Sequence, residues 1–254
     1  MQTLNIERKE NYAVIQLNRG KANVIDQQMV REIRETFAQL ENDDSVKGVV
    51  LTGTPHFFSA GLDVIELYGY DEQQIKDFFV DFGGMFIQLA KFPKPFVCGI
   101  TGHSPAGGCV IAIAADYRIM ATGEKYTIGL NEVAVNIQIS NNLINTYAYW
   151  IGSGLANQYI LEGRLLKVEE ALQCGLVNEV CPLEDVIDKA ESKMKHYLRA
   201  DEEIFKNTKF KLRQHLLESF ETDPEADLGQ AIKLWWKPEI RAKMKYFVES
   251  LQKK

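Results

Sequence analysis

The stretch "HSPAGGCVIAIAAD", residues 103–116, places two adjacent glycines directly before a run of small apolar residues. An apolar strand expected at 95–102 leads into it, so Gly107 and Gly108 fall where a strand ends and a helix begins. The first N–H groups of a helix have no acceptor within it, and they lie at the positive end of its dipole. The segment therefore predicts a site for developing negative charge, although an isolated pair of glycines is more often a tight turn.

A second stretch, "HFFSAGLDVIEL" at residues 56–67, repeats this design. It follows an apolar strand expected at 46–54, carries the small residues Ser59, Ala60 and Gly61, and then begins a short helix. Two backbone donors from separate strand ends could converge on one carbonyl oxygen and form an oxyanion hole. Each donor in such a hole is worth about 3 kcal/mol of the reaction barrier.

The bulk composition limits the classes of function. The chain has 254 residues, 46% of them hydrophobic and 25% charged, which suits one large soluble domain or a domain with an appendage. A net charge of −6 argues against a nucleic-acid partner, and the longest apolar run, 109–115, is too short to span a membrane. The first residues lack the apolar core of a signal peptide, and the four cysteines show no CxxC spacing, so we expect a cytoplasmic protein with reduced thiols. His56, His196 and His215 lack zinc spacing, and no metal site is expected.

The hydrophobic pattern alternates strands and helices before changing to helices. Strands are expected at 12–19, 46–54, 95–102, 117–121, 126–129 and 176–182. Helices are expected at 27–43 (capped by Asp26), 71–92 with an interruption at Gly83–Gly84, 109–115, 141–151, 154–162, 168–173, 185–199, 202–220 and 226–252. The pattern predicts an α/β fold followed by a helical appendage.

The two glycine-bearing segments, in this order and spacing, resemble the crotonase family, also called the enoyl-CoA hydratase/isomerase family. The resemblance extends to "LNRGKANVID" near the start and "GLANQYILEGRLLKVEEALQCGLVNEVCP" at 154–182. It implies a spiral of β-β-α units over residues 1–196, and a C-terminal helical oligomerisation region over 197–254. It further implies trimers or hexamers of paired trimers, an acyl-coenzyme A thioester as substrate, and no cofactor, because coenzyme A is part of the substrate.

The resemblance also assigns roles to residues. The N–H groups of Leu62 and Gly107 would hold the thioester oxygen, and Glu132 would move the proton. The expected substrate-binding residues are Lys21, Ala22, Asn23, Ala60, Gly61, Asp63, Val64, Gly108 and Val110. An ordinary surface lysine is an equal interpretation of Lys21, and Asp63 is expected mainly to cap the short helix.

The number of carboxylates distinguishes the members of the family. Its members carry acids or bases at places that correspond here to Val110, Glu132 and Ser140, of which one is a carboxylate. Hydration needs two acidic groups, whereas moving a double bond from the 3,4 to the 2,3 position needs one base that takes a proton from C2 and returns it at C4. The stretch "GGCVIAIAADYRIMATGEKYTIGLNEVAV" is also similar to mitochondrial-type Δ3,Δ2-enoyl-CoA isomerases. "NIQISNN", residues 136–142, departs from their usual glycine and proline.

Alternatives remain open at this point. A glutamate is most often a solvated surface residue, and Glu132 is a base only if its apolar flanks bury it. A hydratase or another acyl-CoA lyase or decarboxylase could recruit Glu66, and a non-catalytic acyl-CoA binder would keep both glycine motifs. Four other features have structural explanations: His103 as a packing residue, Asp116 as a tie at the helix end, Tyr147, Tyr149 and Trp150 as core or interface residues, and Trp235–Trp236 as a subunit contact or ligand cover.

Overall fold

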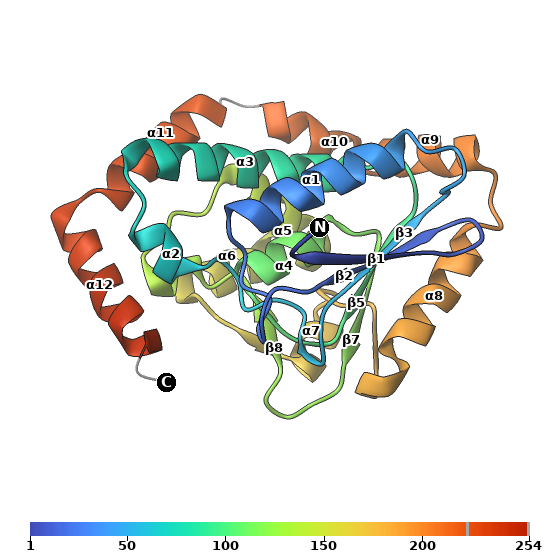
Figure 1. The fold of residues 1–254 in the computed structure, drawn as a ribbon, viewed down its shortest axis with the longest axis horizontal. Helices are drawn as coiled ribbons and strands as arrows, with labels where there is room; N and C mark the ends of the chain where they lie inside the picture. The colour runs from blue at the N-terminus through green and yellow to red at the C-terminus, as the bar shows by residue number, and fades with distance from the viewer. Residues whose placement is uncertain (222–223, 253–254) are drawn as a thin grey trace.

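A six-stranded sheet forms the centre of the molecule (Figure 1). The computed structural model describes residues 1–221 and 224–252. The strand order is β1-β2-β3-β5-β7-β10, with β1 antiparallel to β2 and the other neighbours parallel. Its strands are β1 (Leu4–Arg8), β2 (Ala13–Leu17), β3 (Val49–Thr52), β5 (Phe96–Ile100), β7 (Tyr117–Ala121) and β10 (Glu179–Cys181).

A second, four-stranded sheet is built mainly from strands that directly follow a strand of the first. Its order is β4-β6-β8-β9, and its members are β4 (His56–Phe57), β6 (Gly102–Pro105), β8 (Thr127–Gly129) and β9 (Leu166–Lys167). Thus β3, β5 and β7 each enter the large sheet, and the next strand along the chain enters the small one before a helix follows. This repeat is the predicted spiral of β-β-α units, and the prediction of fold class is confirmed.

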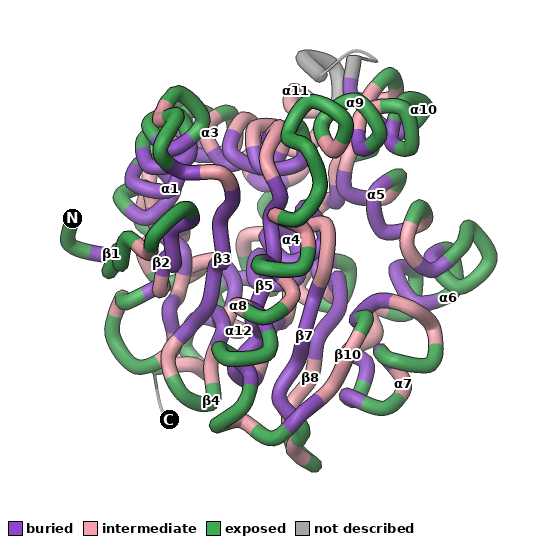
Figure 2. Tube along the Cα trace, turned by 90° about the vertical axis from the view of Figure 1, so that its right-hand side faces the viewer, coloured by how far each residue is buried: buried purple, intermediate pink, exposed green. Residues whose placement is uncertain are grey.

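The central strands β2, β3, β5 and β7 of the large sheet are buried on both faces, which explains their continuous apolar sequences. Val14, Val50 and Val97 are in register and pack against α8 (Val186–Tyr197). The alternate residues join the core under three helices on the opposite face, where α1 and α3 lie in Figure 1. These helices are α1 (Gln27–Glu41), α3 (Glu72–Ala90) and α4 (Gly107–Ala114). Figure 2 shows the buried strands inside a shell whose outer turns are exposed.

The remaining helices complete the shell. They are α2 (Val64–Tyr68), α5 (Asn141–Ile151), α6 (Ser153–Glu162), α7 (Val168–Gln173), α9 (Glu202–Leu212), α10 (Gln214–Glu218), α11 (Pro224–Trp235) and α12 (Pro238–Gln252), with single-turn helices η1 (Glu132–Val135), η2 (Leu183–Asp185) and η3 (Ser219–Glu221). Helix α11 packs on α3, and α12 packs on α2. Residues 222–223 and 253–254 of the predicted C-terminal region lie outside the described residues.

Most predicted elements are present, and the differences have physical causes. Strand β1 is absent from the prediction because it is an edge strand with four of its five residues exposed, so it lacks an apolar pattern. The predicted interruption of the helix at Gly83–Gly84 is wrong, since α3 continues through both residues, and an added Cβ at Gly83 would meet open space. The predicted helix 202–220 divides at Arg213, and the predicted helix 226–252 divides before Pro238, where proline disfavours helical backbone in the preceding residue.

The predicted N-cap of α1 is confirmed. The Asp26 side chain accepts a hydrogen bond from Met29 N at 2.7 Å and caps α1. All four cysteines are free thiols, and three of them are buried. Within residues 1–221 and 224–252, no helix is long and apolar enough to cross a membrane, and no three His, Cys, Asp or Glu side chains are grouped so that they could hold a metal ion.

Candidate active site

The segment that carries Leu62, residues 56–67, is called here the oxyanion segment. It is held in place by a parallel β-bridge between Ile25 and Leu62. Ile25 N donates to Gly61 O at 2.8 Å, and Asp63 N donates to Ile25 O at 2.9 Å. In a parallel bridge, the residue between these two bonds directs its own N–H away from the partner strand. The Leu62 N–H accordingly has no acceptor within the part of the chain that the structure describes.

The segment that leads into α4 has an unusual backbone conformation at Ala106. This residue has φ +45° and ψ −118° and directly precedes the helix. Ala106 N donates to Gly129 O at 2.8 Å, which fixes this turn against β8. Gly107 is the first residue of α4, so its N–H has no acceptor in the helix. Like many strained backbone positions, Ala106 lies where we expect chemistry.

The two segments are in direct contact. A Cβ added to Gly61 would lie 3.4 Å from Gly107 N, and one added to Gly107 would lie 3.3 Å from Leu62 Cδ2. A Cβ on Gly108 would come within 2.7 Å of the Ser59 carbonyl oxygen, closer than such atoms approach in real proteins. The glycines therefore permit the close packing of the two segments that carry the Leu62 and Gly107 amides, and such packing is a requirement of the predicted oxyanion hole.

Glu132 supplies a buried carboxylate on the segment that follows β8. It begins η1, three residues after Gly129, and is 6% exposed. Its Oε2 has no hydrogen-bond partner among the described residues. Burial raises the pKa of Glu132 from 4.5 to about 7, against a smaller opposing effect of its own backbone N–H. The expectation that this side chain is buried is confirmed, although only Ile128 and Leu130 of its apolar flanks are buried and Val133 is exposed. A group with this pKa can accept and return a proton near neutral pH.

The surroundings of Glu132 are mainly apolar. Burial first, and then the charge of Glu132, raise the pKa of the Cys109 thiol, which places the carboxylate near the first turn of α4. Val110, in the same turn, is fully buried and offers no acidic group. Tyr147 is also fully buried, and its hydroxyl has no hydrogen-bond partner in the described chain. The site thus combines one carboxylate with apolar and weakly acidic neighbours.

The other aromatic candidates mainly support the structure. Trp150 donates to Ile113 O at 2.8 Å and lies under the Arg118 guanidinium at 3.8 Å. Trp235 packs edge-on against Phe79. Tyr149 is exposed. Asp116 accepts from Phe96 N at 2.8 Å and pairs with cations of α9 and Arg213, which confirms its structural role.

The loop of Lys21, Ala22 and Asn23, which is predicted to bind substrate, has residues at its surface and one buried residue. Lys21 is exposed and Ala22 half-buried, and Ala22 O accepts from Ala60 N at 2.8 Å. Asn23 is fully buried, and its Nδ2 donates to Thr54 Oγ1 and to the carbonyls of Phe57 and Phe58. The Asn23 side chain therefore holds the loop in shape, which leaves Lys21 and Ala22 as the residues of this loop that face outward. On the facing segments, Ala60, Asp63 and Val64 are half-buried, whereas Gly61 and Gly108 are buried.

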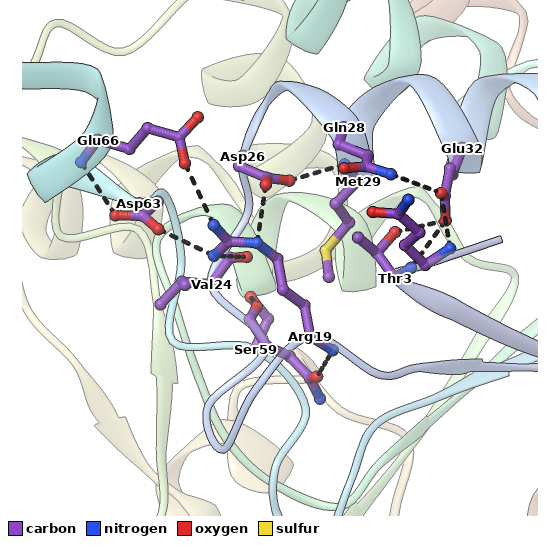
Figure 3. Close-up of polar contacts among 12 residues, drawn as sticks. Thr3, Arg19, Val24, Asp26, Gln28, Met29, Glu32, Ser59, Asp63 and Glu66 are labelled. Atoms are coloured by element: carbon purple, nitrogen blue, oxygen red, sulfur yellow. Dashed lines mark hydrogen bonds and ion pairs between the residues drawn. The ribbon is translucent and has the colours of Figure 1, made fainter. Parts of the chain in front are cut away.

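The structure adds one residue that the sequence interpretation did not include. Arg19 forms ion pairs with Asp26, Asp63 and Glu66, as Figure 3 shows. Asp63 also accepts from Glu66 N at 3.1 Å and caps α2, as predicted. The only sequence signal for this cluster is the arginine that follows a strand in "LNRGKANVID", because its partners are far away along the chain.

Three comparisons relate the chain to known proteins. The family model described as enoyl-CoA hydratase/isomerase matches residues 7–254. The mouse protein "Enoyl-CoA delta isomerase 1, mitochondrial" is 33% identical over 243 residues, which cover 95% of this chain and 84% of that protein. "Short-chain-enoyl-CoA hydratase" of Clostridium acetobutylicum is 29% identical over 188 residues, covering 73% of this chain and 71% of the relative. The crystal structure of human mitochondrial delta3-delta2-enoyl-CoA isomerase is 29% identical, with a TM-score of 0.95 and 99% coverage of both chains.

Proposed function

The chain belongs to the enoyl-CoA hydratase/isomerase family, and from this premise we propose that it moves the double bond of a 3-enoyl-CoA to the 2 position. Glu132 removes a proton from C2 of the substrate. The Leu62 and Gly107 amides hold the thioester oxygen while negative charge develops on it in the dienolate. Glu132 then returns the proton at C4, so one carboxylate serves as base and acid, and coenzyme A enters only as part of the substrate.

The observation that carries this proposal is the buried Glu132, whose Oε2 has no hydrogen-bond partner among the described residues. Burial raises the pKa of Glu132 to about 7, so the ionised base and the protonated acid are about equally stable near neutral pH. We expect kcat/KM to rise with pH through about 7 and then level off, because only the ionised carboxylate can take the C2 proton. A pH profile that is flat from pH 5 to 9 would contradict this assignment.

The main alternative, a hydratase, needs a second acidic group to orient water. Val110 is buried and aliphatic where the family carries one such acid. Glu66, the other candidate, pairs with Arg19 at 3.2 Å and accepts a hydrogen bond from the Tyr70 hydroxyl. Because both oxygens of Glu66 are engaged, the isomerase is favoured over the hydratase.

The test compares two substrates. We expect 3-hexenoyl-CoA to give 2-hexenoyl-CoA, followed by the ultraviolet absorbance of the conjugated thioester, and 2-hexenoyl-CoA to give little 3-hydroxy product by mass spectrometry. Glu132→Gln is expected to bind hexanoyl-CoA normally and to lose isomerisation by at least about a hundredfold. Glu35→Gln, a change at an exposed carboxylate of α1, is the matched control.

Other outcomes of this test point to other functions. Near-normal isomerisation by Glu132→Gln would refute the role of Glu132. Efficient hydration would favour a hydratase, and binding of acyl-CoA without turnover of either substrate would favour a non-catalytic binder.

We also propose a trimer or a hexamer of paired trimers. Exposed apolar side chains support this assembly: Leu155 and Leu161 on α6, and Val133 on the neighbouring η1. Sedimentation equilibrium measures the assembly directly, and a monomer would contradict it. A cytoplasmic location stays a prediction, to be checked by cell fractionation, because the mouse and human relatives are named as mitochondrial proteins.

A further inference from the structure

We propose that Arg19 is a positioning residue that aims the Leu62 amide at the thioester oxygen. This inference rests on the proposed function. Its basis is a single guanidinium, 25% exposed, that joins the two chain segments on either side of the Leu62 bridge (Figure 3). Arg19 itself lies outside the oxyanion hole, so its effect on catalysis passes through the backbone that it holds.

The first contacts of Arg19 are with the segment that holds Leu62 in place. Ile25 makes both backbone hydrogen bonds of the bridge to Gly61 and Asp63. On one side of Ile25, Arg19 Nη1 donates to Val24 O at 3.2 Å. On the other side, Arg19 Nε pairs with Asp26 Oδ2 at 2.8 Å. The guanidinium therefore fixes the residues before and after Ile25.

The second contacts are with the segment that carries Leu62. Asp63 has φ −72° and ψ +75°, the geometry of an inverse γ-turn, and Val64 N donates to Leu62 O at 2.8 Å. Arg19 Nη1 pairs with Asp63 Oδ2 at 2.9 Å. Since the turn at Asp63 directly follows Leu62, a rotation of Asp63 would also change the direction of the Leu62 N–H.

A third contact secures the helix that follows. Arg19 Nη2 pairs with Glu66 Oε2 at 3.2 Å, and Glu66 N donates to the capping Asp63 carboxylate. The Arg19 backbone is anchored as well, because its N–H donates to Asn23 Oδ1 at 2.9 Å and its carbonyl accepts from Asn23 N at 3.1 Å. Both the backbone and the guanidinium of Arg19 are thus held in place, so Arg19 can restrict the movement of the oxyanion segment.

The chemistry of the guanidinium explains why an arginine is required. Three carboxylates from two separate segments and one carbonyl surround it. A planar group with five N–H donors can serve all four, whereas a lysine ammonium has three donors on one atom. Without this cation, three neighbouring negative charges would repel one another and loosen the bridge.

The experiment measures the polarisation of a bound thioester, which reports directly on the oxyanion hole. The probe is hexanoyl-CoA labelled with carbon-13 at its carbonyl, a saturated ester that neither an isomerase nor a hydratase can convert. Isotope-edited infrared spectroscopy is applied to the wild type, Arg19→Met and Arg19→Lys. Arg34→Met is the matched control, because Arg34 also bridges α1 to a carboxylate, Asp81, but on the α1–α3 surface.

We expect the wild type and Arg34→Met to lower the carbonyl stretch below that of the free ester. Arg19→Met should lose most of this lowering, and Arg19→Lys should be intermediate. In the isomerase assay, Arg19→Met should lower kcat at least about tenfold while KM changes less than about threefold, because a misaimed donor weakens transition-state binding most. Arg19→Lys keeps the charge and provides the readout if Arg19→Met does not fold.

Three results would overturn the proposal. One is that the carbonyl stretch of bound hexanoyl-CoA has the same frequency in both Arg19 variants as in the wild type. Another is weaker binding of hexanoyl-CoA with an unchanged band, which would mean that Arg19 contacts the coenzyme directly. The third is that hexanoyl-CoA bound to the wild-type protein absorbs at the frequency of the free ester, which would mean that the protein has no oxyanion hole. If the wild type isomerises nothing but Arg19→Met still loses the shifted band, the proposed function fails and the role of Arg19 stands.

Discussion

The two ends of α4 are built in opposite ways. At its C-terminal end, Arg213 donates to Ala114 O and Ala115 O at 3.1 Å each, and Arg118 donates to Ala115 O at 3.0 Å. At its N-terminal end, the Gly107 N–H has no acceptor in the described part of the chain, and the preceding Ala106 holds a strained backbone. The last two carbonyls of this buried helix region, at Ala114 and Ala115, are therefore hydrogen-bonded by arginine side chains, whereas the first N–H of the helix is left open.

A carboxylate lies near each end, Asp116 with its side chain 10% exposed and Glu132 buried, and the two show the same contrast. Asp116, after the C-terminal end, accepts from Phe96 N and pairs with Lys209 and Arg213. Glu132, near the N-terminal end, has an Oε2 with no partner among residues 1–221 and 224–252. Satisfied groups stabilise the fold, whereas an unsatisfied group stores free energy that a reaction can use. The comparison predicts opposite responses to mutation at the two ends.

The largest effect is expected at the bonded end. Asp116→Asn would leave the side chains of Lys209 and Arg213, 4% and 5% exposed, as buried cations without their anion. We expect the free energy of unfolding to fall by about 3–5 kcal/mol, measured by urea denaturation. Asp81→Asn, which removes the anion from a half-exposed pair with Arg34, should cost less than about 1 kcal/mol. Equal losses in the two variants would contradict the special role of the bonded end.

The opposite response is expected at Glu132. Its pKa is raised from 4.5 to about 7 in the folded protein, so the folded state holds a proton that the unfolded state releases over this range. Folding stability should therefore fall as pH rises from about 4.5 to about 7, by about 3 kcal/mol in total. Glu132→Gln should remove this decrease and be more stable than the wild type at pH 8, while losing activity. Thermal unfolding at pH 5 and pH 8 tests this, and a wild type whose stability rises over that interval would contradict it.

A smaller effect is expected from a single methyl group at the open end. In Gly108→Ala the new Cβ would lie 2.7 Å from Ser59 O, and this backbone must move. We expect a loss of about 1–3 kcal/mol in stability, together with a loss of turnover, because the Ser59 hydroxyl accepts from Gly61 N and supports the oxyanion segment. Gly83→Ala, inside α3 with open space around it, should instead gain about 0.5–1 kcal/mol. Similar stability changes in the two variants would refute the argument from close packing.

The sequence predicts the open end of α4 better than the bonded end. Gly107 and Glu132 are recognisable because strand, glycine and carboxylate stand in a local order that a family resemblance can match. The expected burial of Glu132 follows from its apolar flanks. The partners of Asp116 do not follow, since Lys209 lies 93 residues further along the chain and its pairing depends on how α9 packs.

Arg19 was missed for the same physical reason. Its partner Glu66 is 47 residues away, and the pair forms only after the loop that follows β2 and the start of α2 have been brought together. An arginine beside acidic residues is common on any soluble surface, so composition gives no signal for such a cluster. What the sequence lacks in both cases is the three-dimensional neighbourhood of a charged side chain.

The smallest expected change in stability concerns Ala106. Its φ of +45° and ψ of −118° are costly for a residue with a Cβ, by about 1–3 kcal/mol, whereas glycine adopts them freely. Because glycine loses about 0.5–1 kcal/mol through the entropy of the unfolded chain, Ala106→Gly should gain about 1 kcal/mol overall. Ala38→Gly, on the exposed face of α1, should lose up to about 1 kcal/mol, so the same substitution has opposite signs at the two positions. Urea denaturation of both variants measures this contrast, and a destabilised Ala106→Gly would mean that the open end of α4 stores no backbone strain.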